Sequence, residues 1–301
     1  MKHLVLLLCA TTAFAQTSER LNKFREITGF EAPESIAASE NTLFVSNLGK
    51  NGGPSDKDGN GFISKIEKTQ GKVLEMKWIT GLDAPKGLWL AKNTLYVTDI
   101  DKILGFDIKN GKKTFEMTIP NVAFLNDIAM RDGNTMYVSA TDVNKIFEIN
   151  ISKKTAKALE ITTPVGANGL YYHTKEKALY VCGFGGKDAK GGFSKITNLN
   201  ATPKVETMNI KLGNYDGLIV PEKDYAILSD WINPAQKVGR IQYYNMKTEL
   251  VKSIPLERAF GGPADFFFDT TNSCFYIPCM TENKVYIQQM GGILSEVDVM
   301  D

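Results

Sequence analysis

Residues 27–33 read ITGFEAP, and residues 79–85 repeat this pattern as ITGLDAP. Each copy leads through a short apolar run and a polar turn into a run rich in β-branched and aromatic residues, LFVSN at 43–47 and LYVTD at 95–99. The unit recurs four more times, with second runs MYVSA (136–140), LYVCG (179–183), AILSD (226–230) and FYIPC (275–279). Self-similarity at this spacing is typical of repeat architectures.

Each unit continues with a third amphipathic run, such as ILGFDI, KIFEIN or KVYIQQ, and often a fourth. No segment shows sustained helical periodicity. Equivalent positions lie 40 to 52 residues apart, which suits about four strands per unit. Six such units predict an all-β fold, a six-bladed β-propeller, whose radial packing protects the sheet edges.

The beginning of the chain predicts how the ring closes. The segment LNKFREITG before the first unit resembles VLEMKWITG, which would be the outer strand of blade 1. Residues 21–28 are therefore expected to supply a strand to the last blade. We expect one propeller domain over residues 16–301.

Composition excludes some classes of protein. The 301 residues are 43% hydrophobic and 23% charged, which suits a globular chain. The formal net charge is +1 and falls to 0 without Lys2. A chain without a basic field is not expected to bind nucleic acid.

The first 15 residues have the pattern of a signal peptide. Lys2 is followed by the apolar run LVLLLCA (4–10) and by the small-x-small sequence Ala13-Phe14-Ala15. The run is too short for a membrane span, and no later run of 18 apolar residues occurs. The mature chain is expected to begin at Gln16 and to be periplasmic or secreted, with no membrane span.

Three cysteines remain after cleavage: Cys182, Cys274 and Cys279. Cys274 and Cys279 lie in one strand-like run, where five residues span about 16 Å, too far for a disulfide. No disulfide framework is expected.

Alignment of the units places one residue of each inner strand on a ring about the central axis: Glu34, Lys86, Asn126, Asn168, Asp216 and Ala264. Four of these six residues offer oxygen atoms. Two carboxylates and two amides suit a hard divalent cation, Ca²⁺ or alternatively Mg²⁺ or Mn²⁺. The ring contains no His or Cys, which Zn²⁺ prefers. The alternative interpretation is a polar channel that holds water.

The motifs PES (Glu34), NDI (Asn126), NGL (Asn168) and DGL (Asp216) resemble the calcium-binding motifs of the senescence marker protein/gluconolactonase (regucalcin-like) family and its paraoxonase relatives. The resemblance spans all six units. It implies a six-bladed propeller that hydrolyses lactones or esters, with Asp216 as both metal ligand and candidate catalytic base. The substrate would be a small lactone, ester or sugar acid whose carbonyl the ion polarises.

Two residues depart from this resemblance. His173, the one histidine of the mature chain, is expected in a turn of blade 4, so the paraoxonase-type histidine base is missing. Lys86 stands in the ring, where its ammonium would either replace the ion or act as an electrophile beside it. We include Lys86 with Asp216 as a candidate catalytic residue.

Further candidates lie near the ring and in one loop. Residues at the ends of second strands, or next to ring positions, are candidates for binding substrate: Asp99, Tyr215, Asp230 and Trp231. Residues 56–67 match an EF-hand calcium loop, but GFISKIE after the loop favours a strand over a helix. A hairpin loop with Asp56, Asp58 and Asn60 either binds a second calcium ion or is a polar turn.

Two functions follow from the sequence. The first is an exported, metal-dependent hydrolase of the lactonase type. The second is a propeller that binds a ligand or a protein without catalysis, and in one form of this alternative Lys86 takes the place of the metal. The fold alone does not distinguish them.

Overall fold

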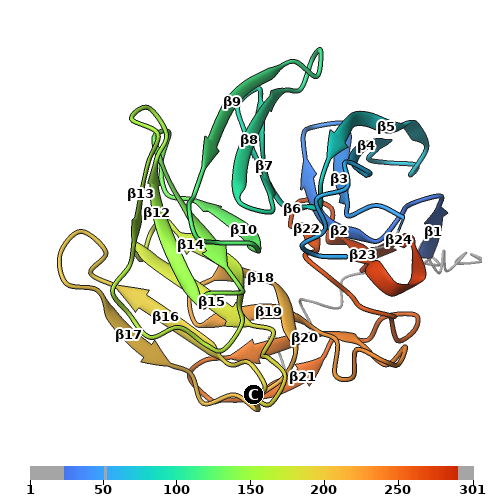
Figure 1. Cartoon of the computed structure of the whole chain (residues 1–301). Helices are drawn as coiled ribbons and strands as arrows, with labels where there is room; N and C mark the ends of the chain where they lie inside the picture. The colour runs from blue at the N-terminus through green and yellow to red at the C-terminus, as the bar shows by residue number, and fades with distance from the viewer. Residues whose placement is uncertain (1–23, 51–52, 291–301) are drawn as a thin grey trace, which may run out of the picture.

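The computed structural model describes residues 24–50 and 53–290. Twenty-four strands form six antiparallel sheets of four strands each. Figure 1 shows the sheets arranged around a common centre, with the first strand of each sheet toward it. The predicted six-bladed β-propeller is confirmed.

The blades follow chain order from the inner strand outward. Blades 1 and 2 contain β2 (Pro33–Ala38), β3 (Thr42–Asn47), β4 (Gly61–Glu67) and β5 (Val73–Leu82), then β6 (Pro85–Ala91), β7 (Thr94–Asp99), β8 (Lys102–Asp107) and β9 (Lys113–Thr118). Blades 3 and 4 contain β10 (Leu125–Met130), β11 (Thr135–Ala140), β12 (Lys145–Asn150) and β13 (Thr155–Ala158), then β14 (Ala167–His173), β15 (Ala178–Gly183), β16 (Phe193–Thr197) and β17 (Lys204–Thr207). Blades 5 and 6 contain β18 (Tyr215–Glu222), β19 (Tyr225–Asp230), β20 (Arg240–Asn245) and β21 (Val251–Ser253), then β22 (Phe267–Asp269), β23 (Cys274–Cys279), β24 (Lys284–Gln289) and β1 (Phe24–Thr28).

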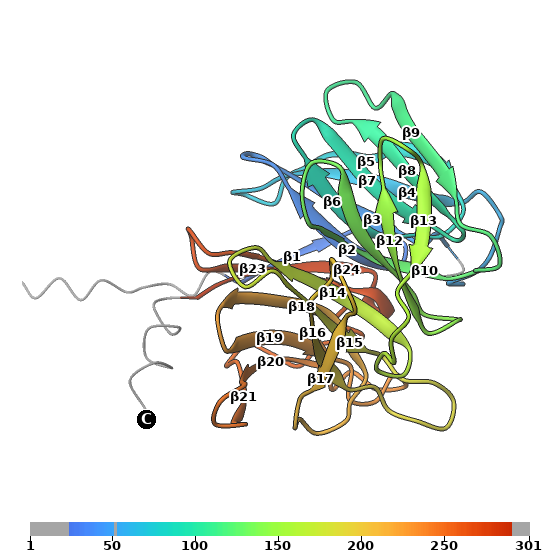
Figure 2. The ribbon, with the colours of Figure 1, turned by 90° about the vertical axis from the view of Figure 1, so that its left-hand side faces the viewer.

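The N-terminal strand closes the ring, as predicted. β1 pairs antiparallel with β24, from Phe24 opposite Gln288 to Thr28 opposite Lys284. Figure 2 shows β1 with the last blade, where it is the edge strand next to β24. Residues 21–23 of the predicted strand and the predicted signal peptide lie outside the described residues.

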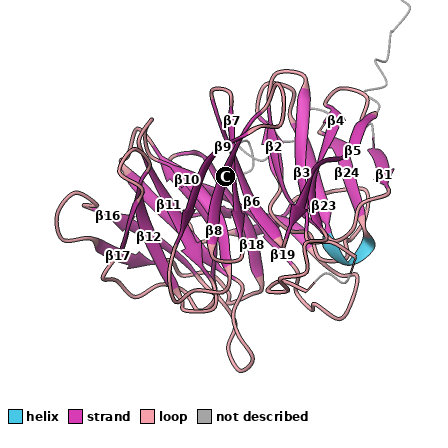
Figure 3. Ribbon diagram, turned by 45° about the horizontal axis from the view of Figure 1, so that its top comes forward, coloured by secondary structure: helices cyan, strands magenta, loops and turns pink. Residues whose placement is uncertain are grey.

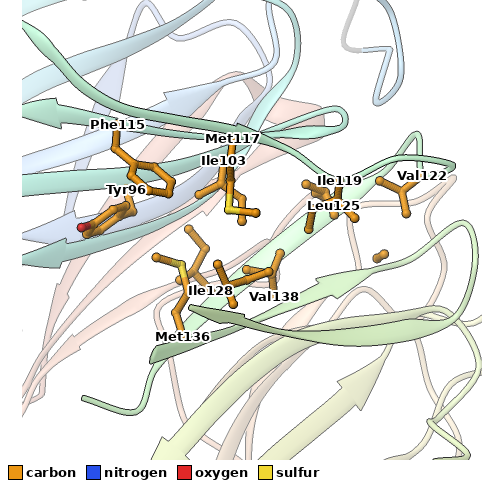
Figure 4. Close-up of a cluster of buried hydrophobic side chains, with 12 residues drawn as sticks. Tyr96, Ile103, Phe115, Met117, Ile119, Val122, Leu125, Ile128, Met136 and Val138 are labelled. Atoms are coloured by element: carbon orange, nitrogen blue, oxygen red, sulfur yellow. The ribbon is translucent and has the colours of Figure 1, made fainter. Parts of the chain in front are cut away.

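Apolar side chains fill the seams between neighbouring blades. In the described part of the chain, six large buried clusters occur, one at each seam. Figure 4 shows the cluster between blades 2 and 3, where Ile103 and Met117 face Ile128 and Val138. Burial at these seams is the main force that holds the blades together, at about 25 cal/mol per Å² of apolar surface removed from water.

Helix is almost absent from residues 24–50 and 53–290, as Figure 3 shows. The one helical element there is a 3-10 turn, η1 (Met280–Glu282). No helix in this part of the chain is long and apolar enough to cross a membrane. Cys182, Cys274 and Cys279 are buried free thiols, and the last two lie on the same strand, as expected.

Candidate functional site

A backbone irregularity marks the ring position in each of the first five blades. Pairing between the inner and second strands skips two residues at this point, between Pro33 and Ile36 in blade 1 and at the equivalent residues of the next four blades. Such bulges re-aim side chains and interrupt the backbone ladder. The skipped pairs are Glu34/Ser35, Lys86/Gly87, Asn126/Asp127, Asn168/Gly169 and Asp216/Gly217.

Small polar side chains on the second strands replace the missing ladder bonds. The Ser229 hydroxyl accepts a hydrogen bond from the Gly217 N–H at 2.7 Å and donates one to the Ala264 carbonyl of blade 6 at 3.0 Å. Equivalent positions in the other blades hold Ser46, Thr98, Ser139 and Cys182, each bonded to the backbone of an inner strand. The bonds of Thr98, Cys182 and Ser229 to carbonyls cross to the next blade, whereas Ser46 and Ser139 bond within their own blade.

Four ring side chains carry a buried oxygen without a hydrogen-bond partner. Among the described residues, the atoms concerned are Glu34 Oε2, Asn126 Oδ1, Asn168 Oδ1 and Asp216 Oδ1. The four residues are only 2–4% exposed. Leaving a buried polar atom unpaired costs about 1–3 kcal/mol, so four such oxygens at equivalent strand positions make the ring a candidate ligand site.

The electrostatics of the ring favour a cation. Burial raises the pKa of Glu34 well above its usual range, and the charges of Asp216 and Asp265 raise it further. Burial, and then Asp265, likewise raise the pKa of Asp216. Carboxyl groups that raise each other's pKa values share a region of negative potential.

The donor atoms of the ring are of the type that a hard cation prefers. Within residues 24–50 and 53–290, no group of three or more His, Cys, Asp or Glu side chains is arranged to hold a metal ion. The ring has only two carboxylates, so an ion there would also depend on the amide oxygens of Asn126 and Asn168. Carboxylate and amide oxygens together are typical ligands of Ca²⁺.

Lys86 is fully buried, and its ammonium is held by the backbone and an aromatic ring. Its ammonium donates a hydrogen bond to the Ala84 carbonyl at 2.9 Å and lies 4.6 Å from the centre of the Phe124 ring. It makes no ion pair within 4.0 Å with Glu34 or Asp216. Burial lowers the pKa of Lys86 to about 8, although the nearby Glu34 charge opposes this shift.

The two aspartates predicted at the channel mouth are engaged with backbone. Asp99 accepts hydrogen bonds from the N–H groups of Asp83 and Ala84, which connect blades 1 and 2. Asp230 accepts them from Asn214 and Ile232, at 3.2 and 2.9 Å. Both carboxylates therefore hold the connection that leads into their blade, and Asp230 also holds the turn after β19.

Tyr215 and Trp231 lie in different surroundings. Tyr215 packs in the seam between blades 4 and 5, and its hydroxyl donates to the Lys211 carbonyl. The Trp231 ring meets Phe184 edge-on, with centroids 5.1 Å apart. Its indole N–H is close enough to lower the pKa of Asp216 but does not form a hydrogen bond with it.

The loop before β4 connects two strands of a hairpin, as the sequence predicted, and is not flanked by helices. Within it the Asn60 side chain donates to Asp58 at 2.5 Å, and Lys57 pairs with Asp101 at 2.8 Å.

His173 is the last residue of β14, where its Nδ1 accepts a hydrogen bond from the Glu176 N–H.

Sequence reasoning missed Asp127 and Asp265, the residues that follow ring positions in blades 3 and 6. Asp127 accepts hydrogen bonds from the N–H groups of Ile128 and Leu170, both at 2.6 Å. Asp265 accepts one from Ser35, and burial raises its pKa to about 7. A signal was present, because Ser, Gly or Asp occupies this position in all six units.

By its fold and its buried polar ring residues, this protein is a six-bladed propeller with polar side chains near its centre. No family model matches the sequence, and no curated protein matches it. A catalytically inactive variant of virginiamycin B lyase from Staphylococcus aureus, solved with quinupristin, is similar in structure: 17% identity, 89% of this chain, 99% of that chain, TM-score 0.57. A streptogramin B lyase is 13% identical, with 89% of this chain and 97% of that chain covered and a TM-score of 0.58. Kuenenia stuttgartiensis hydrazine synthase is 16% identical, with 91% of this chain and 81% of that chain covered and a TM-score of 0.62. At such identities the likeness shows the fold alone.

Proposed function

We propose that this protein is an exported hydrolase of the lactonase type, with a calcium ion held by Glu34, Asn126, Asn168 and Asp216. The observation that carries the proposal is the set of four buried, unpartnered oxygens at equivalent ring positions. Two carboxylates would balance the charge of a divalent ion, and two amides would supply neutral oxygens. The resemblance of the four ring motifs to the regucalcin-like family supports the same assignment.

The bound ion would polarise the substrate carbonyl and stabilise the developing oxyanion. Asp216 would take the proton of the attacking water, because it is the carboxylate that matches the candidate base of the family. The burial of the ring limits competing water and strengthens each electrostatic interaction in the site. Lys86 is not paired with a carboxylate, and its ammonium would meet negative charge on a substrate that reaches the buried ring.

The structural likeness to two lyases suggests a second chemistry, which the residues do not favour. The inactive virginiamycin B lyase variant has a histidine replaced by alanine. In the described part of this chain the one histidine is His173, five residues beyond Asn168 along β14. Five residues of strand span about 16 Å, so an imidazole base at the ring is not provided.

The test is hydrolysis of a panel of lactones and aryl esters by chelator-treated protein with and without added calcium. We expect calcium-dependent turnover that falls at least 100-fold in Asp216→Asn, since a general base typically contributes 10²–10⁴-fold. Asp58→Asn, in the hairpin loop, is the matched control and should retain activity. Calcium binding without turnover on the whole panel would favour the non-catalytic function instead.

A further inference from the structure

The channel contains a second feature at the end opposite the ring residues. A cavity of about 300 Å³ lies where the inner strands finish, lined by the second halves of β2, β6, β14 and β18. The ring residues lie near the start of the same strands and do not line it. The cavity therefore adjoins the candidate metal site, since the Asp265 N–H donates to the Glu34 carbonyl at 2.9 Å, but none of the four candidate metal ligands lines it.

The walls of this cavity are apolar and aromatic. Leu88, Leu218 and Ile128 come from three blades, and Trp89, Tyr171 and Phe267 add aromatic surface. A neighbouring cavity of about 230 Å³ between blades 5 and 6 shares Pro221, Phe268 and Thr270 with it. An apolar cavity of roughly 150 Å³ accommodates benzene, so the main cavity has room for a larger apolar body.

Two carboxyl groups lie among these apolar walls. Asp127 is 4% exposed and has both oxygens engaged by backbone N–H groups. Asp265 is half-buried, and the structure gives a partner to only one of its oxygens, Oδ2, which accepts a hydrogen bond from Ser35 at 2.5 Å. The second Asp265 oxygen is therefore available to a ligand in the cavity.

The charges that line the cavity are unbalanced. Among its lining residues, which all belong to the described chain, there is no Lys, Arg or His to offset Asp127 and Asp265. An anionic ligand would be repelled by the ionised form of Asp265, whereas an ammonium group would stabilise that form. An ammonium group would pair with Asp265 and is also attracted to the faces of aromatic rings.

We infer that this cavity binds a small apolar amine, with the ammonium group on Asp265 and the apolar body against Trp89, Leu88 and Phe267. The ligand enters from the end of the channel where the inner strands finish. The charge selects an ammonium head, and the apolar walls select a hydrocarbon or aromatic body rather than a sugar.

Calorimetric titration of the whole protein with three probes of similar shape tests this inference. The probes are 2-phenylethylamine, the neutral 2-phenylethanol and the anionic 3-phenylpropionate. We expect one molecule of the amine to bind at least tenfold more tightly than the alcohol, and no binding of the anion. Equal affinities for the amine and the alcohol would overturn the inference.

Variants locate the site. Asp265→Asn keeps the shape and should lower amine affinity to that of the alcohol, whereas Glu160→Gln, which removes an exposed acid outside both cavities, should change nothing. If Asp265→Asn fails to fold, Ala38→Trp, at the partly buried end of β2, should block both probes. Unchanged amine affinity in either folded variant would contradict the assignment. Quenching of tryptophan fluorescence that disappears in Trp89→Phe, with the heat of binding retained, would support it.

Discussion

The Ser35 hydroxyl donates a hydrogen bond of 2.5 Å to the carboxylate of Asp265, although 230 residues separate them. The same hydroxyl accepts a hydrogen bond from the Leu88 N–H at 3.2 Å, and residues 35 and 265 also form a parallel bridge. One small side chain thus joins the inner strands of blades 6, 1 and 2. Closure of the ring is therefore coupled to the geometry at its centre, next to Glu34.

Closure at the outer edge depends on β1, and Ile27 is its buried residue. Ile27 packs in the cluster between blades 6 and 1, whereas Thr28 on the same strand is exposed. We expect Ile27→Ala to lower the free energy of unfolding by about 2–5 kcal/mol, because it leaves a cavity in that seam. Urea denaturation measures the change. Thr28→Ala should stay within about 0.5 kcal/mol, and equal effects of the two variants would show that β1 does not hold the blade.

A second prediction concerns close packing between inner strands. A Cβ atom on Gly169 would lie 2.1 Å from the Asp216 carbonyl oxygen, so any side chain must push the two strands apart. We expect Gly169→Ala to destabilise the protein by about 2 kcal/mol or more and to displace Asp216. Gly133→Ala is the control, since nothing lies within 4 Å of its Cβ position. Thermal melting of both variants gives the comparison, and a wild-type melt for Gly169→Ala would contradict the described packing.

The pH dependence of the metal-free protein follows from the channel carboxyls. Burial raises the pKa values of Glu34, Asp127 and Asp216 and takes that of Asp265 to about 7. Unfolded carboxyls lose their protons near pH 4. Between about pH 4 and 7 the folded state therefore binds more protons than the unfolded state, and its free energy of unfolding falls as pH rises.

We expect the melting temperature of chelator-treated protein to fall by several degrees between pH 5 and 7.5. Added calcium should remove most of this loss, because it stabilises the ionised ring. Melts in steps of pH, with and without calcium, measure both effects. A metal-free melting temperature that rises over this interval would mean that the carboxyls are not held in a costly environment.

Lys86 distinguishes between two roles in the ring. Because its ammonium bonds to the Ala84 carbonyl and faces Phe124, we expect Lys86→Met to keep calcium affinity within about threefold and to lower turnover at least tenfold. Lys102→Met, at the start of β8, is the control for loss of a charge. Tighter calcium binding in Lys86→Met would instead show that the ammonium competes with the ion.

The repeat made the fold predictable from sequence, because each blade needs the same two β-rich runs and the same turn. The alignment also found equivalent backbone positions, since the bulge falls at the same place in each of five blades. Side-chain surroundings were harder to predict. Asp99 has the same chemistry whether it faces solvent or accepts two backbone N–H groups, and only the path of the connecting chain decides which.

Tyr215 illustrates a second limit. Its position next to Asp216 suggested the channel mouth, but the residue points into the seam between blades 4 and 5. Neighbouring side chains of a strand point to opposite faces, so Tyr215 and Asp216 do not share a face. The bulge at Asp216 and Gly217 then changes the direction of the side chains that follow Tyr215. Asp265 lay outside the prediction for a different reason: the aligned ring residue of blade 6 is Ala264, which has no oxygen in its side chain.

Calcium titration of chelator-treated protein by calorimetry tests the central claim most directly, with wild type, Asn168→Leu and Asp58→Asn in parallel. Asn168→Leu removes one amide oxygen from the ring at nearly constant shape, and Asp58→Asn removes one charge from the hairpin loop. The account predicts that wild type and Asp58→Asn bind one ion and gain about 2.7 kcal/mol of stability at a hundredfold excess over Kd, while Asn168→Leu loses both effects. Full binding in Asn168→Leu, together with its loss in Asp58→Asn, would place the ion in the loop and contradict a metal centre in the channel.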